Sequence, residues 1–453
     1  MNGVSDVWLK SDTKHWQLEL APALAQRVAA AQAYVERQPE QTWLVYHQQR
    51  SSFVIWLLAL IAAGRTPLLP GNGRPETLRL AARLADRELV DTAVPTPASA
   101  TILHAPHVLT GNLDAELVLF TSGSSGVPQA VHKSLRQLFT EVATLETTFG
   151  AQLGDCQVVS TITHQHIYGL LFTVLWPLCT GREVAAKRIE YPEQWLAFQR
   201  QTQQPYALVS SPAQLERFTQ DLDLREFSSK LRAVFSSGGP LHESVPARCV
   251  AAAIASPIEV YGSTETGGIA WRQRQHAKQP FRLLPGIKAQ ADANGQLQLR
   301  SPHLGAADID SDGWYTTADL VHFMAADTFI VEGRADRIIK LAEKRLSLTE
   351  VEQFTAQLDW VAQAHCCVMD GDKRVELGLV VQLNELGQRR LAQEGKFALR
   401  QVVRQHLNQR FETVVLPRKF RYVTRLPYNE AGKLTQAALQ QIFHSDSTAA
   451  GSS

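Results

Sequence analysis

The chain has 453 residues, a net charge of +1 and a hydrophobic content of 45%. This composition is typical of a globular protein with room for two or more domains. The balanced charge argues against a nucleic-acid-binding protein, so we expect no nucleic-acid partner. The longest apolar run, Phe53 to Ala63, is too short to span a bilayer. It predicts a buried helix and no membrane span.

Residues from about 20 to 90 are predicted to be mostly helical. Ala21 to Arg37 carries apolar residues at helical spacing, and Glu76 to Leu89 repeats leucine and alanine at three- and four-residue steps. From 116 to 261, predicted strands alternate with helices, which favours an α/β sheet covered by helices. The predicted strands are Glu116–Thr121, Gln157–Thr161, Glu183–Ala186, Ala207–Ser210, Leu231–Ser236 and Pro257–Tyr261, and the helices include Pro192–Gln203 and Glu243–Ile254.

Beyond about residue 280, turn residues multiply and short strands predict a small β-subdomain. After Gly333 a new α+β unit is predicted, with helices at Thr349–Gln357 and Leu399–Phe411 and strands at Val361–Met369, Val375–Gln382 and Phe420–Thr424, before a final helix. The expected fold is therefore α/β and multidomain, with a large N-terminal domain of α/β layers over residues 1–333 and an α+β C-terminal domain over 334–443. A disordered tail is expected over 444–453.

The cysteines point to the compartment of the protein. There are five, scattered along the chain and without a C-x-x-C pair, which predicts reduced thiols and no zinc site. Cys366 and Cys367 lie in an apolar run and are predicted to be strand residues. Since the N-terminus also lacks the apolar core of a secretory signal, we expect a cytoplasmic protein.

A loop of small residues follows the first predicted strand of the α/β sheet. It comprises Thr121, Ser122, Gly123, Ser124, Ser125 and Gly126. Backbone N–H groups and hydroxyls in such a loop can converge on an anion, above all a polyphosphate. It is not a Walker loop, because no Gly-Lys-Ser/Thr follows at the required distance. Taken alone, the loop could also be a plain turn.

Four further segments supply groups that could hold a nucleoside triphosphate. A carboxylate beside the loop can hold Mg²⁺, and a second can accept hydrogen bonds from both ribose hydroxyls. An arginine can complete that clamp, and a lysine on a glycine-containing loop can reach negative charge that develops at the α-phosphate. The segments that carry these groups are Val260–Gly267, Asp312–Leu320, Gly333–Lys340 and Leu426–Leu434.

The order and spacing of these segments resemble the adenylate-forming superfamily, which includes acyl-CoA synthetases, aryl-CoA ligases, luciferases and adenylation domains. The resemblance covers roughly residues 40 to 440. It implies an enzyme that uses ATP and Mg²⁺ to convert a small carboxylic acid to an acyl-AMP, and then passes the acyl group to a thiol. It also implies that the C-terminal domain is mobile and rotates about a hinge between the two half-reactions.

The resemblance assigns site residues position by position. Thr121 to Gly126 match the phosphate loop, and Ser237, Gly238 and Gly239 match a segment that lines the acyl and adenine sites. Tyr261, Gly262, Ser263, Thr264 and Glu265 match a Tyr-Gly-x-Thr-Glu segment, in which Tyr261 stacks near adenine, Thr264 touches phosphate and Glu265 holds Mg²⁺. Asp319 and Arg334 match the ribose-binding pair, Asp336 the hinge, Lys433 the lysine that drives adenylation and Lys340 a residue presented to the thiol cofactor. His166 matches a gate beside the carboxylate, a position for which His164 competes.

Two positions depart from the family pattern. Gln129 stands where the phosphate loop usually has lysine, which leaves Lys133 as a candidate replacement. Glu343 stands where a glycine usually lets the thiol arm pass, which points to a different acceptor or a rearranged loop. The Glu343-Lys344-Arg345 variant resembles ligases of aryl polyene and related pigment pathways, which load an aryl acid onto an acyl carrier protein.

The expected activity is therefore an acid:thiol ligase for a small aryl acid, such as 4-hydroxybenzoate. The acceptor is CoA or an acyl carrier protein, and the sequence leaves both open. One alternative is a medium- or long-chain fatty acyl-CoA synthetase. Two others are an adenylating enzyme that acylates nitrogen or oxygen, and a non-catalytic nucleotide-binding relative that acts as a scaffold.

Overall fold

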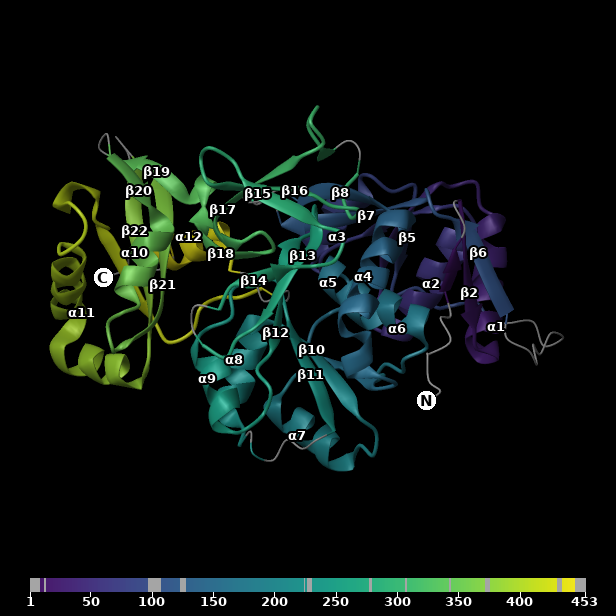
Figure 1. Cartoon of the computed structure of the whole chain (residues 1–453), viewed down its shortest axis with the longest axis horizontal. Coiled ribbons are helices and arrows are strands. Elements are labelled where there is room, and N and C mark those ends of the chain that lie inside the picture. Colours follow the sequence, from purple (N-terminus) through teal and green to yellow (C-terminus); the bar gives the residue numbers. More distant parts are fainter. Residues whose placement is uncertain are drawn as a thin grey trace, which may run out of the picture.

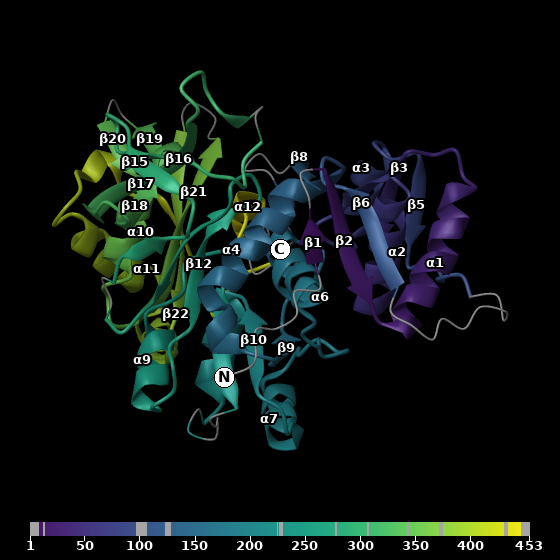
Figure 2. The same ribbon diagram turned by 45° about the vertical axis from the view of Figure 1, so that its right-hand side comes forward.

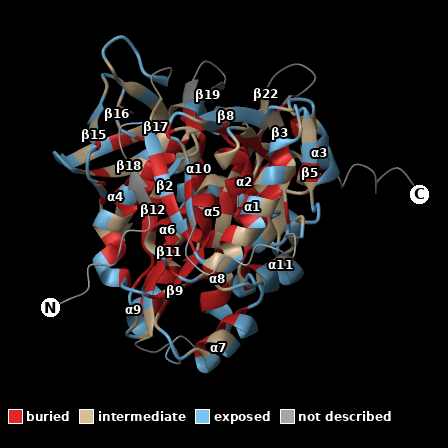
Figure 3. Cartoon of the chain, turned by 90° about the vertical axis from the view of Figure 1, so that its right-hand side faces the viewer, coloured by how far each residue is buried: buried red, intermediate tan, exposed pale blue. Residues whose placement is uncertain are grey.

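The computed structural model describes residues 9–11, 14–96, 107–122, 128–223, 225, 230–276, 279–305, 308–341, 344–370, 375–429 and 434–444. The N-terminal elements lie at one end of the molecule and the C-terminal elements at the opposite end (Figure 1). A view turned by 45° keeps this arrangement (Figure 2). Buried residues gather in the middle, around the helix α2 (Arg50–Ala62) and the strand β11 (Leu231–Ser236) (Figure 3).

A mostly parallel sheet forms the N-terminal part, in the order β5-β3-β4-β7-β8. Its last strand, β8, pairs antiparallel with β7. The apolar helix α2 is buried from Phe53 to Ile61, as the sequence predicts. A smaller sheet has the order β1-β2-β6. The bounds are β1 Leu9–Ser11, β2 His15–Leu20, α1 Pro22–Glu36, β3 Thr42–Tyr46, β4 Thr66–Leu69, α3 Pro75–Ala82, β5 Arg87–Val90, β6 His107–Asn112, β7 Glu116–Ser122 and β8 Pro128–Ser134.

The prediction that residues 20–90 are mostly helical is wrong in part, because β3, β4 and β5 lie between the helices. The predicted helix Glu76–Leu89 ends at Ala82, and its last residues belong to β5. These are parallel strands, and parallel strands covered on both faces carry short apolar runs without alternation. Such runs cannot be told from buried helix by periodicity.

The central sheet has the order β15-β16-β17-β18-β14-β13-β12-β11-β10-β9. The strands β9 to β12 are parallel, and the remaining neighbours pair antiparallel, so the predicted β-subdomain continues the α/β sheet. Glu183–Ala186 is not a strand, because only Val184 pairs, with Val158. The strands are β9 Gln157–Ser160, β10 Tyr206–Ser210, β12 Ile258–Ser263, β13 Gly267–Gln273, β14 Phe281–Leu283, β15 Lys288–Ala291, β16 Gln296–Arg300, β17 Tyr315–Ala325 and β18 Thr328–Arg334.

Helices connect the strands of this part of the chain, between β8 and β12. The longest of them, α4, is capped at its N-terminus by Ser134, whose side chain forms a capping box with Gln137, so that two backbone N–H groups are satisfied. The bounds are α4 Leu135–Leu153, α5 Ile167–Leu170, the π-helix η1 Leu171–Leu175, α6 Trp176–Thr180, α7 Pro192–Gln201, α8 Pro212–Asp221 and α9 Ser244–Ala251.

The C-terminal part has its own sheet, β21-β22-β23, and its own apolar core. Cys366 and Cys367 are buried in β21, as predicted. The helix predicted at Leu399–Phe411 falls in the second part of α11, Glu385–Leu407, whose helical backbone is interrupted by a kink at Gly395. The bounds are β19 Ile338–Leu341, β20 Lys344–Ser347, α10 Leu348–Thr355, β21 Val361–Asp370, β22 Val375–Leu383, α11 Glu385–Leu407, β23 Lys419–Val423 and α12 Gln436–His444. His444 ends α12, and residues 445–453 of the predicted tail lie outside the described residues.

These elements confirm the predicted α/β architecture, and the boundary at 333/334 stays a prediction. A polar contact joins the C-terminal part to the central part. The Gln363 side chain of β21 donates to the Glu216 carboxylate of α8 at 2.9 Å and accepts from the Tyr428 hydroxyl at 2.6 Å. In the part of the chain that the structure describes, no helix is long and apolar enough to cross a membrane.

Candidate active site

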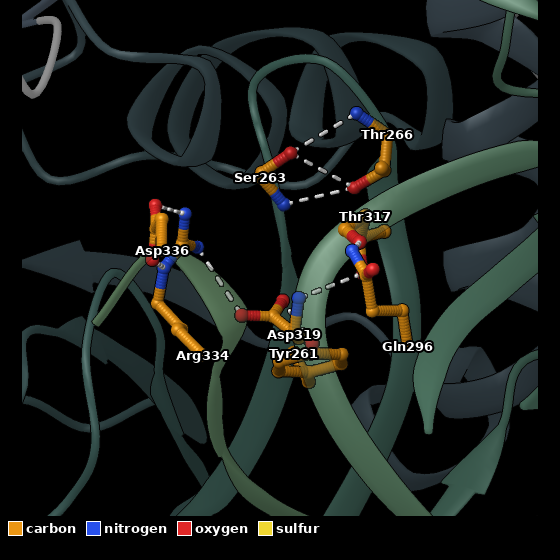
Figure 4. A network of polar contacts seen from close by, with 8 residues as sticks. All are labelled: Tyr261, Ser263, Thr266, Gln296, Thr317, Asp319, Arg334 and Asp336. Carbon is orange, nitrogen blue, oxygen red and sulfur yellow. Dashed lines mark hydrogen bonds and ion pairs between the residues drawn. The ribbon is translucent and has the colours of Figure 1, made fainter. Parts of the chain in front are cut away.

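Three strands of the central sheet bring Tyr261, Asp319 and Arg334 together. Asp319 on β17 and Arg334 on β18 are direct cross-strand partners, and their side chains form an ion pair at 3.2 Å. The Tyr261 hydroxyl, at the end of β12, donates a hydrogen bond to the other Asp319 oxygen. Figure 4 shows the Asp319 carboxylate between the arginine and the tyrosine. The sheet therefore places the predicted ribose-binding pair beside the predicted adenine-stacking residue.

Packing fixes the Tyr261 side chain. Its ring lies against Phe281 and Phe329, with centroids 5.3 and 5.7 Å away. Burial, reinforced by the Asp319 carboxylate, raises the pKa of Tyr261 well above its usual value, so the hydroxyl stays protonated and acts as a donor. The Asp319 main-chain N–H also bonds to the Thr317 hydroxyl at 3.1 Å. The Asp319 carboxylate is thus held in one orientation.

Asp336, the predicted hinge residue, is joined to this cluster through Arg334. Two hydrogen bonds, of 2.9 and 2.6 Å, connect the Arg334 guanidinium to both Asp336 oxygens. These bonds raise the pKa of Arg334 and lower that of Asp336, so both groups stay charged. The predicted hinge and the predicted ribose clamp therefore share one arginine.

The predicted metal-binding residue Glu265 lies in the turn between β12 and β13. Ser263 and Thr266 close this turn: each backbone N–H bonds to the other's hydroxyl, at 3.0 and 3.2 Å. A Cβ at Gly262 would come within 2.2 Å of the Gly267 carbonyl oxygen, so only glycine fits there. The side chain of Thr264, the predicted phosphate contact, is partly exposed in the same turn.

The Glu265 carboxylate is available to a ligand, since it has no hydrogen-bond or ion-pair partner within the described residues. One free carboxylate fits Mg²⁺, a hard cation that binds one or two protein carboxylates together with substrate phosphates and water. Across the described ranges, no group of three or more His, Cys, Asp or Glu side chains forms a metal site of its own. The donor set therefore fits a Mg²⁺ ion that arrives with a nucleotide.

The segment Ser237–Gly239 follows β11 at the same edge of the sheet. The Ser237 hydroxyl donates to the Val260 carbonyl of β12 at 2.8 Å, which joins this segment to the strand that carries Tyr261. Because β11 and β12 are parallel neighbours, their carboxyl ends meet at one edge of the sheet. Ligands of open α/β sheets bind at such an edge.

The two candidate gate histidines differ in their surroundings. His164 is buried, and its Nε2 lies 3.0 Å from the His47 carbonyl oxygen. His166 is half-buried, and its ring approaches Gly71: a Cβ there would lie 3.0 Å from the His166 ring and 3.2 Å from the Phe120 carbonyl oxygen. His166 therefore lies beside the last residues of β7, where the predicted phosphate loop begins, and His164 is a core residue.

Several predicted site residues cannot be placed. Gly123, Ser124, Ser125, Gly126 and Lys433 lie outside the described residues, as does the departure at Glu343. Thr121 and Ser122 end β7, and Lys340 belongs to β19, but only their backbones are described.

Lys133 does not replace the missing loop lysine, because it lies in the core. Its side chain is only 2% exposed, and its ammonium group donates to the backbone carbonyls of Glu265 and His303. Burial lowers its pKa, although three carboxylates oppose that effect. The sequence gives no signal for this position, since lysine side chains are mostly exposed to solvent.

Replacing His164 by asparagine should reduce the acid sensitivity of the fold. Burial lowers the pKa of His164 from 6.5 to about 3, so the unfolded chain binds the proton more readily. The contribution of neutral His164 is complete above pH 6.5 and falls by up to about 1.4 kcal/mol per pH unit as the pH drops toward 3. Urea unfolding of both proteins between pH 4 and pH 7 measures this slope. An unchanged slope in the asparagine variant would contradict the assignment.

Comparison with known proteins finds similar sequences and similar folds. The model of the family described as "AMP-binding enzyme" matches residues 76–290. A 4-coumarate–CoA ligase from Cereibacter sphaeroides is 28% identical over 330 residues, which are 72% of each chain. Among solved structures, the o-succinylbenzoate CoA synthetase of Bacillus subtilis, bound to its acyl-adenylate intermediate, superposes with a TM-score of 0.69 at 16% identity and covers 92% of each chain.

A second solved structure has the same fold. The amide bond synthetase McbA from Marinactinospora thermotolerans superposes with a TM-score of 0.71 at 20% identity, over 93% of this chain and 94% of its own. With the family match over the residues that carry Tyr261 and Glu265, these likenesses establish the predicted resemblance. The chain is thus similar to the AMP-binding enzyme family over residues 76–290, as its sequence motifs predict.

Proposed function

We propose that this enzyme activates a small aryl carboxylic acid with ATP and transfers the acyl group to a thiol. The observation that carries the proposal is the cluster of Tyr261, Asp319 and Arg334 on strands that also lead to the free Glu265 carboxylate. A carboxylate flanked by a fixed phenol and an arginine suits the two hydroxyls of a ribose. A second carboxylate, in the turn after the tyrosine, suits the metal that accompanies the phosphates.

In the first half-reaction, a carboxylate oxygen of the acid bonds to the α-phosphorus while the bond to the bridging oxygen breaks and pyrophosphate leaves. Asp319 accepts hydrogen bonds from the ribose, and Tyr261 lies beside the base. Lys433 donates to the negative charge that develops at the α-phosphate. Glu265 would hold Mg²⁺, which offsets the charge of the phosphates when bound.

In the second half-reaction, the thiol sulfur attacks the acyl carbon, the thiol loses its proton and AMP leaves. We propose that the C-terminal domain, residues 334–443, rotates about Asp336 between the two steps and replaces Lys433 by the segment of Lys340 and Glu343. The contact of Gln363 with Glu216 and Tyr428 supports a docked state of this domain. Tyr428 lies five residues before Lys433 in the sequence.

The proposed acid class rests on the relatives. The 4-coumarate–CoA ligase and a 4-chlorobenzoate–CoA ligase from an Arthrobacter species, 24% identical over 363 residues, are named for aryl acids. Both names also support CoA as the acceptor. An acyl carrier protein stays the second candidate, and Glu343 keeps a nitrogen acceptor as a third.

An acceptor assay tests this proposal. The enzyme is given ATP, Mg²⁺ and a panel of aryl and fatty acids, together with CoA, a phosphopantetheinylated carrier protein or a simple amine. We expect release of AMP and a thioester of one aryl acid, seen by mass spectrometry. A fatty acyl thioester would show that the substrate is a fatty acid and not an aryl acid. An amide product would show that the acceptor is an amine, and would overturn the proposed transfer to a thiol.

A further inference from the structure

Hydrogen bonds connect the turn that carries Glu265 to a buried polar cluster, which consists of Lys133, Glu141 and His303. Their exposed fractions are 2, 4 and 0%. Lys133 comes from β8, Glu141 from α4 and His303 from the segment after β16. Residues from three separate elements thus meet under one short turn.

Lys133 joins this turn to a second segment. Its Nζ donates to the Glu265 carbonyl oxygen at 2.5 Å and to the His303 carbonyl oxygen at 2.9 Å. The Gln137 amide, at the start of α4, donates to the same His303 oxygen at 3.2 Å. The backbone of Glu265 is therefore fixed by a charged donor that does not touch its carboxylate.

The other two members of the cluster hold the end of the turn. The Glu141 carboxylate accepts from the Gly268 N–H at 2.6 Å, and the His303 Nδ1 lies 3.1 Å from the Gly268 carbonyl oxygen. The Glu141 carboxylate also packs against Gly267, where φ is +66° and a Cβ would lie 2.5 Å from it. The buried cluster therefore bonds to the backbone at both ends of the turn, to Glu265 through Lys133 and to Gly268 through Glu141 and His303.

Burying an ammonium group is costly, and an apolar side chain of similar volume would often stabilise a fold as well or better. Among the described residues, the Lys133 ammonium group donates to two backbone carbonyls and to no side chain, so its bonds fix backbone positions. The backbone atom that Lys133 fixes belongs to the residue whose carboxylate is free for a metal. Small displacements of such ligands cost affinity, because the groups behind metal ligands set their orientation.

We infer that Lys133 is a positioning residue, which fixes the Glu265 turn so that the Glu265 carboxylate meets the metal of a bound metal–nucleotide complex. This inference rests on the proposed function. It also assigns a role to a lysine that lies four residues after Gln129, in a chain whose phosphate loop lacks the usual lysine. Lys133 acts on the metal ligand, and not on the phosphates.

Calorimetric titration with ATP tests the inference in the presence of Mg²⁺ and in its absence, with EDTA. Lys133→Met should weaken binding of Mg²⁺–ATP by about 10- to 100-fold and leave metal-free ATP binding unchanged, since the clamp of Tyr261 and Asp319 stays intact. In a Glu265→Gln background, Lys133→Met should have no further effect on either titration. If Lys133→Met fails to fold, Lys133→Gln, which retains a polar donor, replaces it.

Arg182→Met is the matched control. It removes another buried cation, 8% exposed, which bonds to Glu146 and to the Gly154 carbonyl beyond the other end of α4. We expect it to lower stability and to leave the Mg²⁺ dependence of ATP binding as in the wild type. Equal losses from Lys133→Met with and without Mg²⁺, or the same loss in the Glu265→Gln background, would overturn the positioning role.

The same titrations separate this inference from the proposed function. If Glu265→Gln alone leaves Mg²⁺–ATP binding unchanged, the proposed role of Glu265 is wrong. If Glu265→Gln weakens that binding while Lys133→Met does not, the proposed function stands and the inference about Lys133 is wrong.

Discussion

Replacing Lys433 by alanine should lower the rate of acyl-adenylate formation by about 100- to 1000-fold. In the proposed mechanism, this lysine is the C-terminal donor to the charge that develops at the α-phosphate. It plays no part once the adenylate exists, so thioester formation from a preformed acyl-AMP should continue at close to the wild-type rate. Single-turnover measurements of each half-reaction separate these two outcomes.

A suitable control for this experiment is Lys396→Ala, which removes an exposed lysine from α11 in the same C-terminal part. It should leave both half-reactions unchanged. If Lys433→Ala still makes acyl-AMP at the native rate, the lysine assignment is wrong. If both half-reactions fall together, the variant has damaged the domain, and the separation of roles is not supported.

Replacing Asp319 by alanine should weaken ATP binding by about 10- to 100-fold, because a hydrogen bond to a charged group contributes roughly 1.5–3 kcal/mol. The change also removes the acceptor of the Tyr261 hydroxyl and one partner of Arg334. Titration with ATP and with 2′-deoxy-ATP gives the measurement. The wild type should bind the deoxy nucleotide more weakly, and Asp319→Ala should bind both equally.

Asp327→Ala serves as the control for Asp319→Ala. Asp327 lies between β17 and β18, in the same sheet, and pairs with Arg282 at 3.8 Å, with both side chains more than half exposed. Exposed pairs of this kind contribute little, so nucleotide binding should not change. If Asp319→Ala retains the preference for the 2′-hydroxyl, Asp319 does not bind the ribose.

Sequence patterns predict those helices and strands that are marked by local signals in the chain. The helix α2 and the strands β7, β10 and β11 are correct, because apolar runs and turn residues mark them directly. The short strands β3 and β4 are missed, because a few apolar residues buried on both faces carry no period. The part of α11 before Gly395 is missed as well, since it is mostly polar and Gly395, which has a non-helical φ of 80°, separates it from the part that follows.

The candidate site also contains residues that the sequence predicts and residues that only the structure reveals. Tyr261, Asp319 and Arg334 stand in sequence motifs, and the contact of Asp319 with Arg334 follows from the pairing of β17 with β18. The cluster under the Glu265 turn has no local signal. Lys133 and His303 are 170 residues apart, and only the folded chain shows that both are buried and bonded.

Acid-dependent exchange between ATP and labelled pyrophosphate tests the central claim most directly, because it requires formation of an acyl-adenylate and does not depend on the acceptor. The assay uses aryl, short-chain and long-chain acids in turn. We predict exchange with a small aryl acid and its loss in Lys433→Ala. Folded protein that binds ATP but gives no exchange with any acid would contradict the account and favour a nucleotide-binding scaffold.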